Sequence, residues 1–203
     1  MNADAVMETD DFKKCVEFHG HICPGLAIGY KAAKAGMAYL KESRADDEEI
    51  VAVVETDACC SDAVQVLTGC TFGKGNFIYK DYGKMTFTFF SRNKGKGVRV
   101  SMRHGAAAPD DEHMKLIQKV IGNEADENEM ERFQVLHMKR SRTVLEMPDD
   151  MLFKIEPVTV QPPPKAVIKP SKPCDACGEP VMSTKMVSLE AGTFCRECAE
   201  KKR

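Results

Sequence analysis

Two pairs of cysteines near the end of the chain have the spacing of a metal-binding motif. Cys174 and Cys177 form the first Cys-x-x-Cys pair, Cys195 and Cys198 form the second, and 17 residues separate them. Each pair can turn two thiolates towards one ion, and four thiolates about 2.3 Å from Zn²⁺ complete a tetrahedron with no open position. The sequence therefore predicts a structural zinc site, which folds its own small domain and carries out no reaction. The alternatives are a redox Cys-x-x-Cys pair, an iron centre of the rubredoxin kind or two disulfides.

A second group of metal-binding side chains lies near residue 20, where His19, His21 and Cys23 occupy alternate positions. Alternate side chains of an extended segment point to the same side, so these three can converge on one ion. Imidazole and thiolate suit Zn²⁺ and other late first-row divalent ions. We add Cys60 as a fourth ligand, because it begins an expected helix whose N-terminus lowers the pKa of a thiol. In the alternative interpretation, His19 caps a helix, Cys23 is buried as a small apolar residue and His21 is exposed.

Cys60 and His21 are the candidate catalytic residues. If Cys60 did not bind the ion, the site would lack a fourth protein ligand and leave a position for water or substrate. These residues identify no reaction, so the sequence leaves open whether the protein is an enzyme. His104, His113 and His137 have no companion motif, and we expect surface or capping roles for them.

The composition is that of a folded protein without a strong overall charge. The 203 residues are 43% hydrophobic and 30% charged, which fits one full domain and a small appendage. A net charge of −2 provides no general attraction for nucleic acid or anionic membrane. The first residues are polar and acidic, unlike a signal peptide, and no apolar run is long enough to cross a bilayer. We therefore expect a cytoplasmic protein without membrane contact, and its high count of nine cysteines favours metal binding over disulfides.

Helical and strand patterns alternate along the first 160 residues. The expected helices cover 10–21, 24–41, 60–69 and much of 110–146, and the expected strands cover 50–54, 77–79, 85–90, 98–102 and 152–160. The turns at 81–84 and 93–97 favour an antiparallel meander of the second, third and fourth strands.

A proline-rich segment divides the chain. Residues 161–173 contain five prolines, which favour a stiff polyproline-type connection and cannot continue a helix or a central strand. We therefore predict a core domain over 1–160, a linker over 161–173 and a zinc domain over 174–203.

Three motifs in the core occur together and in one order: FHGHICPG at 18–25, CSDAVQ at 60–65 and TGCTFGKGN at 68–76. With them the chain resembles the family of the formylmethanofuran dehydrogenase E-subunit (FmdE-like proteins). The resemblance implies an α+β core with a mixed or antiparallel sheet and helices on one face, similar to the C-terminal domain of glyceraldehyde-3-phosphate dehydrogenase. It also implies a C-terminal zinc ribbon or treble clef, a homodimer, and a core metal cluster at His19, His21, Cys23 and Cys60. The stretch from 110 to 146 matches no motif of the family.

Two functions follow from these observations. In the first, the protein is a metal-binding accessory of a molybdenum or tungsten formylmethanofuran dehydrogenase-type redox system, with structural zinc in the tail and a second divalent transition metal in the core. In the second, it is a non-catalytic dimeric regulatory or binding module whose zinc domain docks a protein or nucleic-acid partner.

Overall fold

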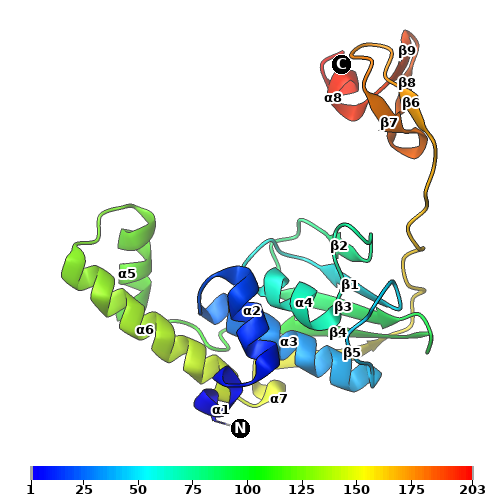
Figure 1. Ribbon diagram of the computed structural model, residues 1–203. Coiled ribbons are helices and arrows are strands. Elements are labelled where there is room, and N and C mark those ends of the chain that lie inside the picture. The colour runs from blue at the N-terminus through cyan, green and yellow to red at the C-terminus, as the bar shows by residue number, and fades with distance from the viewer. Residues whose placement is uncertain (1, 203) are drawn as a thin grey trace. The chain divides into compact units, whose positions relative to one another are not determined.

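The computed structural model describes residues 2–202 and divides the chain into two compact units, one up to Lys165 and one from Ala166 (Figure 1). The first unit has an α+β fold with a mixed sheet, as the sequence predicts. Across residues 2–202, no helix is both long enough and apolar enough to cross a membrane.

The first unit is built on a five-stranded sheet. Its spatial order is β2-β1-β3-β4-β5, with β1 and β2 parallel and every other neighbouring pair antiparallel. The strands are β1 (Ile50–Val54), β2 (Phe77–Tyr79), β3 (Thr86–Ser91), β4 (Lys96–Met102) and β5 (Phe153–Val158). All five residues of β1 are buried, as its β-branched, apolar sequence predicts.

The predicted meander is wrong at β2. Strands β3 and β4 form the expected hairpin, but β2 pairs with β1 and not with β3. The reason is α4 (Cys60–Thr68), which carries the chain back along the sheet after β1, so that β2 runs in the same direction. Buried Asn76 fixes the start of β2, because its side-chain amide donates to the carbonyls of Ile50 and Asp47 at 2.9 and 3.1 Å.

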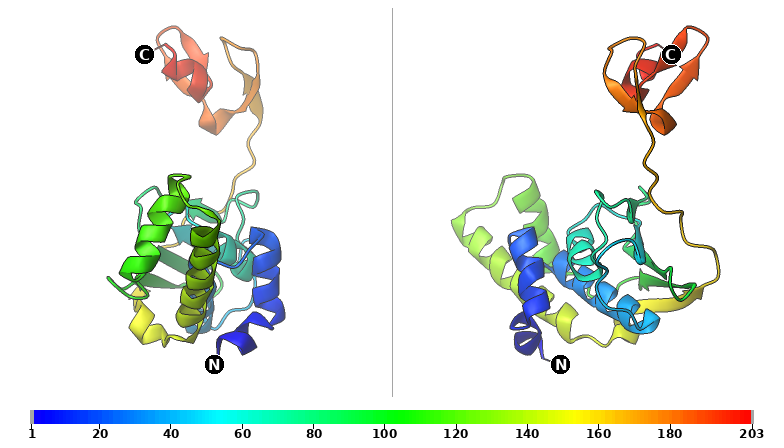
Figure 2. Two further views of the ribbon diagram at one scale, coloured as in Figure 1. Left: turned by 90° about the vertical axis from the view of Figure 1, so that its left-hand side faces the viewer. Right: turned by 45° about the vertical axis from the view of Figure 1, so that its right-hand side comes forward.

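Helices cover one face of this sheet (Figure 2). Those nearest to the metal-binding motif are α2 (Asp10–His19), α3 (Pro24–Leu40) and α4. Helix α3 packs against the sheet, α4 and α6, which explains why most of its residues are buried. Its glycines permit close contact: a Cβ on Gly29 would lie 2.1 Å from the Cys60 carbonyl oxygen, and one on Gly36 would lie 2.2 Å from the Phe89 ring.

The remaining helices of the first unit are α1 (Ala3–Met7), α5 (Asp111–Ile121), α6 (Glu127–Glu146) and α7 (Asp149–Leu152). The stretch over 110–146 is thus a helical hairpin, because Asn123 adopts a left-handed φ of 55° and Asp126 begins α6 with a capping box. One end of α6 packs against α1 and α3, while α5 packs against α6 as a projecting arm (Figures 1 and 2).

The second unit contains two short hairpins and a helix. Its elements are β6 (Ser171–Pro173), β7 (Pro180–Met182), the 3-10 helix η1 (Ser183–Lys185), β8 (Val187–Leu189), β9 (Gly192–Phe194) and α8 (Arg196–Glu200). Strand β6 lies at the end of the segment 161–173 and pairs with β7. The small core of this second unit consists of Cys174, Phe194 and Ala199, with a few half-buried apolar side chains around them.

Candidate metal sites

The end of α2 and the start of α3 bring the first group of ligands together. His19 is the last residue of α2, Gly20 ends that helix with a left-handed φ of 93°, and Cys23 is the N-cap of α3. The Cys23 Sγ accepts the backbone N–H of Leu26 at 3.3 Å. The three ligands therefore converge through a helix end and a glycine turn, and not through the extended segment that we expected.

His19, His21 and Cys23 have the geometry of an incomplete metal site. One ligand atom from each residue lies within 4.8 Å of the other two, and the His19 Nε2 is 3.7 Å from the Cys23 Sγ. Asp62 of α4 places its Oδ2 2.7 Å from the His19 Nδ1. A carboxylate in this position fixes the tautomer in which Nδ1 donates and leaves Nε2 free to bind a metal. Cys23 is buried and His21 is exposed, so a metal held here would face solvent with at least one open position.

The structure does not bring Cys60 into this group. Its Sγ faces the Met85 Sδ at 3.6 Å and the Ala58 carbonyl at 3.7 Å, and the side chain is fully buried. Burial raises the pKa of the Cys60 thiol to about 12, so the lowering that we expected from the helix N-terminus is outweighed.

Cys59, which we did not expect as a ligand, lies closer to the group. A Cβ built on Gly25 would be 3.7 Å from the Cys59 Sγ and 3.8 Å from the Cys23 Sγ, so both thiols lie beside this glycine. The signal in the sequence was the Cys59-Cys60 doublet itself. Because neighbouring residues at the start of a helix point in different directions, one of the two must face the core and the other the site.

Two of the histidines to which we assigned surface or capping roles are instead packed together at the base of the α5–α6 arm. His113 is buried, and its Nε2 lies 3.2 Å from the His137 Nδ1. Burial lowers the pKa of both rings, and that of His137 falls to about 4. The expectation of an exposed role is therefore wrong for these two residues, whereas His104 is exposed as expected.

The four tail cysteines form the second group. Their sulfur atoms all lie within 4.8 Å of one another. Cys174 and Cys177 belong to a turn between β6 and β7, and Cys195 and Cys198 belong to the start of α8. This order of knuckle, hairpin and helix is that of a treble clef, one of the two arrangements that we expected.

The backbone around Cys174 favours a thiolate at that residue, whereas the neighbouring Cys195 raises the pKa of Cys198 to about 12. Cys195 donates its backbone N–H to the Cys174 Sγ at 3.2 Å, and Cys198 donates its own to the Cys195 Sγ at 3.3 Å. Backbone N–H groups of Cys177, Cys195 and Ala176 lower the pKa of the Cys174 thiol to about 6. Four sulfur ligands complete a tetrahedron and leave no position for a substrate, so the tail cysteines fit a structural metal site. The three core residues fit a metal site with an open coordination position.

Comparison with known proteins agrees with this architecture. Residues 18–154 match the family described as "FmdE, Molybdenum formylmethanofuran dehydrogenase operon". The chain belongs to the FmdE family. The matched residues include the whole core site and the α5–α6 arm, but end before the tail.

Two similar proteins extend the comparison. A probable S-adenosyl-L-methionine-binding protein of Archaeoglobus fulgidus is 37% identical over 190 residues, which are 90% of this chain and 50% of that protein. The chain therefore spans about half the length of this relative. A crystal structure of a tungsten formylmethanofuran dehydrogenase FmdE-like protein from Syntrophus aciditrophicus superposes with a TM-score of 0.63 and 22% identity. The match covers 98% of this chain and 92% of that one, which shows a shared fold.

Proposed function

We propose that this FmdE-family protein binds a divalent transition metal in its core at His19, His21 and Cys23, and zinc in its tail at Cys174, Cys177, Cys195 and Cys198. The observation that carries the core site is the Asp62 carboxylate on the His19 Nδ1, which aims the Nε2 of that ring at the Cys23 sulfur. Cys60 completes the site only if it turns away from Met85, whereas Cys59 already lies beside Gly25, as the Cys23 thiol does.

The chemistry at such a site depends on its exposed side. A bound metal with an open position supplies a Lewis acid. His21 is the exposed member of the group and so can contact a bound molecule, and it remains with Cys60 a candidate for a catalytic role. The neighbouring glycine turn leaves this face uncovered, since a Cβ on Gly20 would meet no atom within 4 Å.

The cellular role that we propose is that of an accessory to a molybdenum or tungsten formylmethanofuran dehydrogenase-type redox system. Membership of the FmdE family supports this proposal, and so does the name of the Syntrophus protein, which refers to the tungsten form of that enzyme. We further propose that the protein acts in the cytoplasm as a homodimer.

Metal analysis of the purified protein tests the two sites together. We expect two metals per chain in the wild type and one in a His21→Ala, Cys23→Ser double variant, in which serine keeps the helix cap but is a poor ligand. Cys59→Ala and Cys60→Ala, measured separately, identify the fourth ligand, and His104→Ala is the control. One metal in both the wild type and the double variant would refute the core site.

A second candidate is a non-catalytic binding module, and the separate folding unit of the tail favours it. In that case Cys174→Ser abolishes capture of a protein or nucleic-acid partner without changing the metal content of the core. If the first proposal holds, the His21→Ala, Cys23→Ser variant affects the redox system while partner capture persists.

S-adenosyl-L-methionine is the first small molecule to test, because the name of the Archaeoglobus relative gives it as a ligand. Isothermal titration of this chain shows whether the half of the relative that it spans is sufficient for binding.

A further inference from the structure

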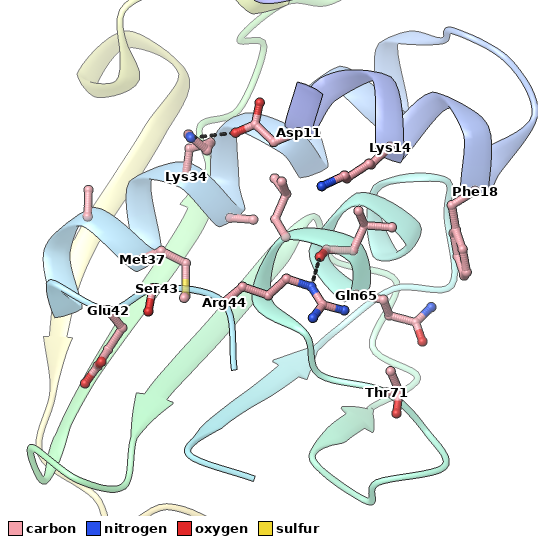
Figure 3. Close-up of a pocket in the computed structure, with 14 residues that line it drawn as sticks. Asp11, Lys14, Phe18, Lys34, Met37, Glu42, Ser43, Arg44, Gln65 and Thr71 are labelled. Atoms are coloured by element: carbon pink, nitrogen blue, oxygen red, sulfur yellow. Dashed lines mark hydrogen bonds and ion pairs between the residues drawn. The ribbon is translucent and has the colours of Figure 1, made fainter. Parts of the chain in front are cut away.

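A large open pocket is lined by Phe18, the residue that precedes His19 in α2. It has a volume of about 780 Å³ and lies between α2, α3 and α4, with the segment after α3 as its floor (Figure 3). This volume is that of a site for a small organic molecule. None of the three proposed core metal ligands lines it.

Much of the pocket wall is apolar. Phe18 is 59% exposed although it is aromatic, and it lines the pocket from the last turn of α2. Met37 of α3 and Leu67 of α4 line it from other sides. Exposed aromatic surface in a concave site is typical of ligand pockets, because it becomes buried when a ligand binds.

Two cations in the pocket have no carboxylate partner within residues 2–202. Lys14 of α2 has no hydrogen bond or ion pair among these residues, and Arg44 donates only its Nε, to the Val66 carbonyl at 3.0 Å. Figure 3 shows both side chains in the pocket wall, Lys14 from α2 and Arg44 from the segment after α3. The terminal nitrogens of this guanidinium therefore remain available for a bidentate contact.

The carboxylates of the pocket are already paired. Asp11 accepts from Lys34 at 2.7 Å and from the Tyr30 hydroxyl at 3.1 Å. Glu42 accepts from the Ser91 hydroxyl at 2.6 Å and lies 3.3 Å from the Lys94 ammonium. The charge of the pocket that is not neutralised is thus positive.

We propose that this pocket binds an organic anion: a molecule with an apolar, ring-containing body against Phe18 and a carboxylate, sulfonate or phosphate between Lys14 and Arg44. Gln65, Ser43 and Thr71 provide hydrogen bonds along the same wall. The assignment is independent of the core metal, because every group that it uses lies outside the metal-binding residues.

The experiment titrates the full-length protein with 8-anilinonaphthalene-1-sulfonate, an aromatic sulfonate whose fluorescence rises on burial. We expect saturable binding of one probe per chain that weakens with ionic strength, and an increase in Kd of about tenfold in Lys14→Gln and in Arg44→Gln. N-phenyl-1-naphthylamine, which lacks the sulfonate, should bind with an affinity that neither substitution changes.

The matched control is Lys13→Gln, one residue away on α2, whose ammonium is paired with Glu8 at 2.7 Å outside the pocket. Equal effects of Lys13→Gln and Lys14→Gln would overturn the proposal. So would loss of sulfonate binding in His21→Ala but not in Lys14→Gln, because the anion would then be bound at the core metal site. A third result would also contradict the proposal: no probe binding, together with a sedimentation coefficient that falls in Lys14→Gln. These two measurements would show that a second copy of the chain covers the pocket.

Discussion

At the scale of single residues, the core site depends on how closely two helices approach. Helix α3 begins with Cys23 as its cap, α4 carries Asp62, and the two helices meet where Gly29 faces the backbone of Cys60. A Cβ at Gly29 would lie 2.1 Å from the Cys60 carbonyl oxygen, a distance that no relaxed structure tolerates. Helix α4 can therefore present Asp62 to His19 only because residue 29 lacks a side chain.

We predict that Gly29→Ala lowers the free energy of unfolding by about 3 kcal/mol or more, since backbone and not a flexible side chain must move. Chemical denaturation measures this loss, and the metal content of the core should fall with it. Gly73→Ala is the control, because its Cβ meets no atom within 4 Å and its φ is not left-handed. Substitutions at neutral surface sites change the free energy of unfolding by about 0.5 kcal/mol. If Gly29→Ala lowered it by less than about 1 kcal/mol, the two helices would not be held at this distance.

The paired histidines of the arm make a second prediction at this scale. The pKa of His137 is lowered to about 4, chiefly by burial and then by the charges of His113, Arg140 and His21. The pKa of His113 is also lowered by burial, although the charge of Asp110 raises it in part. The unfolded chain protonates the His137 ring near its ordinary pKa of about 6.5, so it binds more protons than the folded chain between these two values. The folded protein is therefore more stable when this ring is neutral. This contribution to the free energy of unfolding is fully present above a pH of about 6.5 and is lost as the pH falls towards 4.

Substitution of His137 should remove part of this pH dependence. Between about pH 7.5 and pH 4.5, we expect His137→Gln to lose about 1–2 kcal/mol less stability than the wild type. Urea unfolding at the two pH values measures the difference. His104→Gln, at an exposed histidine, should behave as the wild type. An unchanged pH dependence in His137→Gln would mean that the pKa of this ring is the same in the folded and the unfolded chain.

At the scale of elements, local signals in the sequence predicted most helices and strands but not all of their partners. Pro24 at the first turn of α3 and Gly69 after α4 mark helix ends by their own backbone preferences, and both helices have these ends. The pairing of β2 with β1 depends on the path of α4 across the sheet, which no residue in β2 encodes. The choice between Cys59 and Cys60 likewise depends on which side of α4 packs on the sheet.

The arm provides the prediction at this scale. Asp126 and Glu129 form the capping box of α6, the helix against which α5 packs. Asp126→Ala should cost about 1 kcal/mol locally. We expect faster amide hydrogen exchange in α5 and the first half of α6, with little change in the remainder of the core. Asn128→Ala, an exposed substitution in the same turn, is the control, and a uniform change in exchange across the core would contradict a separately unfolding arm.

At the scale of the whole molecule, the two units rely on different sources of stability. The core unit has a continuous apolar cluster that includes the large buried side chains Phe12, Phe87 and Phe89. Among its residues up to 202, the tail unit has three buried residues, one of which is the proposed ligand Cys174. So small a core does not offset the chain entropy of about 40 residues, and the proposed metal would contribute the difference.

Removal of metal should therefore unfold one unit and leave the other. With a chelator that removes zinc, we expect the amide resonances of residues 171–200 to collapse to unfolded positions, while the sheet residues of the core keep theirs. Cys195→Ser should reproduce this result without chelator, because its hydroxyl still caps α8 but is a poor zinc ligand. Ser183→Ala, at a residue of the tail that is not a ligand, should leave the unit folded. If the tail kept its native resonances after complete loss of metal, its fold would have to come from packing alone, and the four cysteines would have a role other than structural zinc binding.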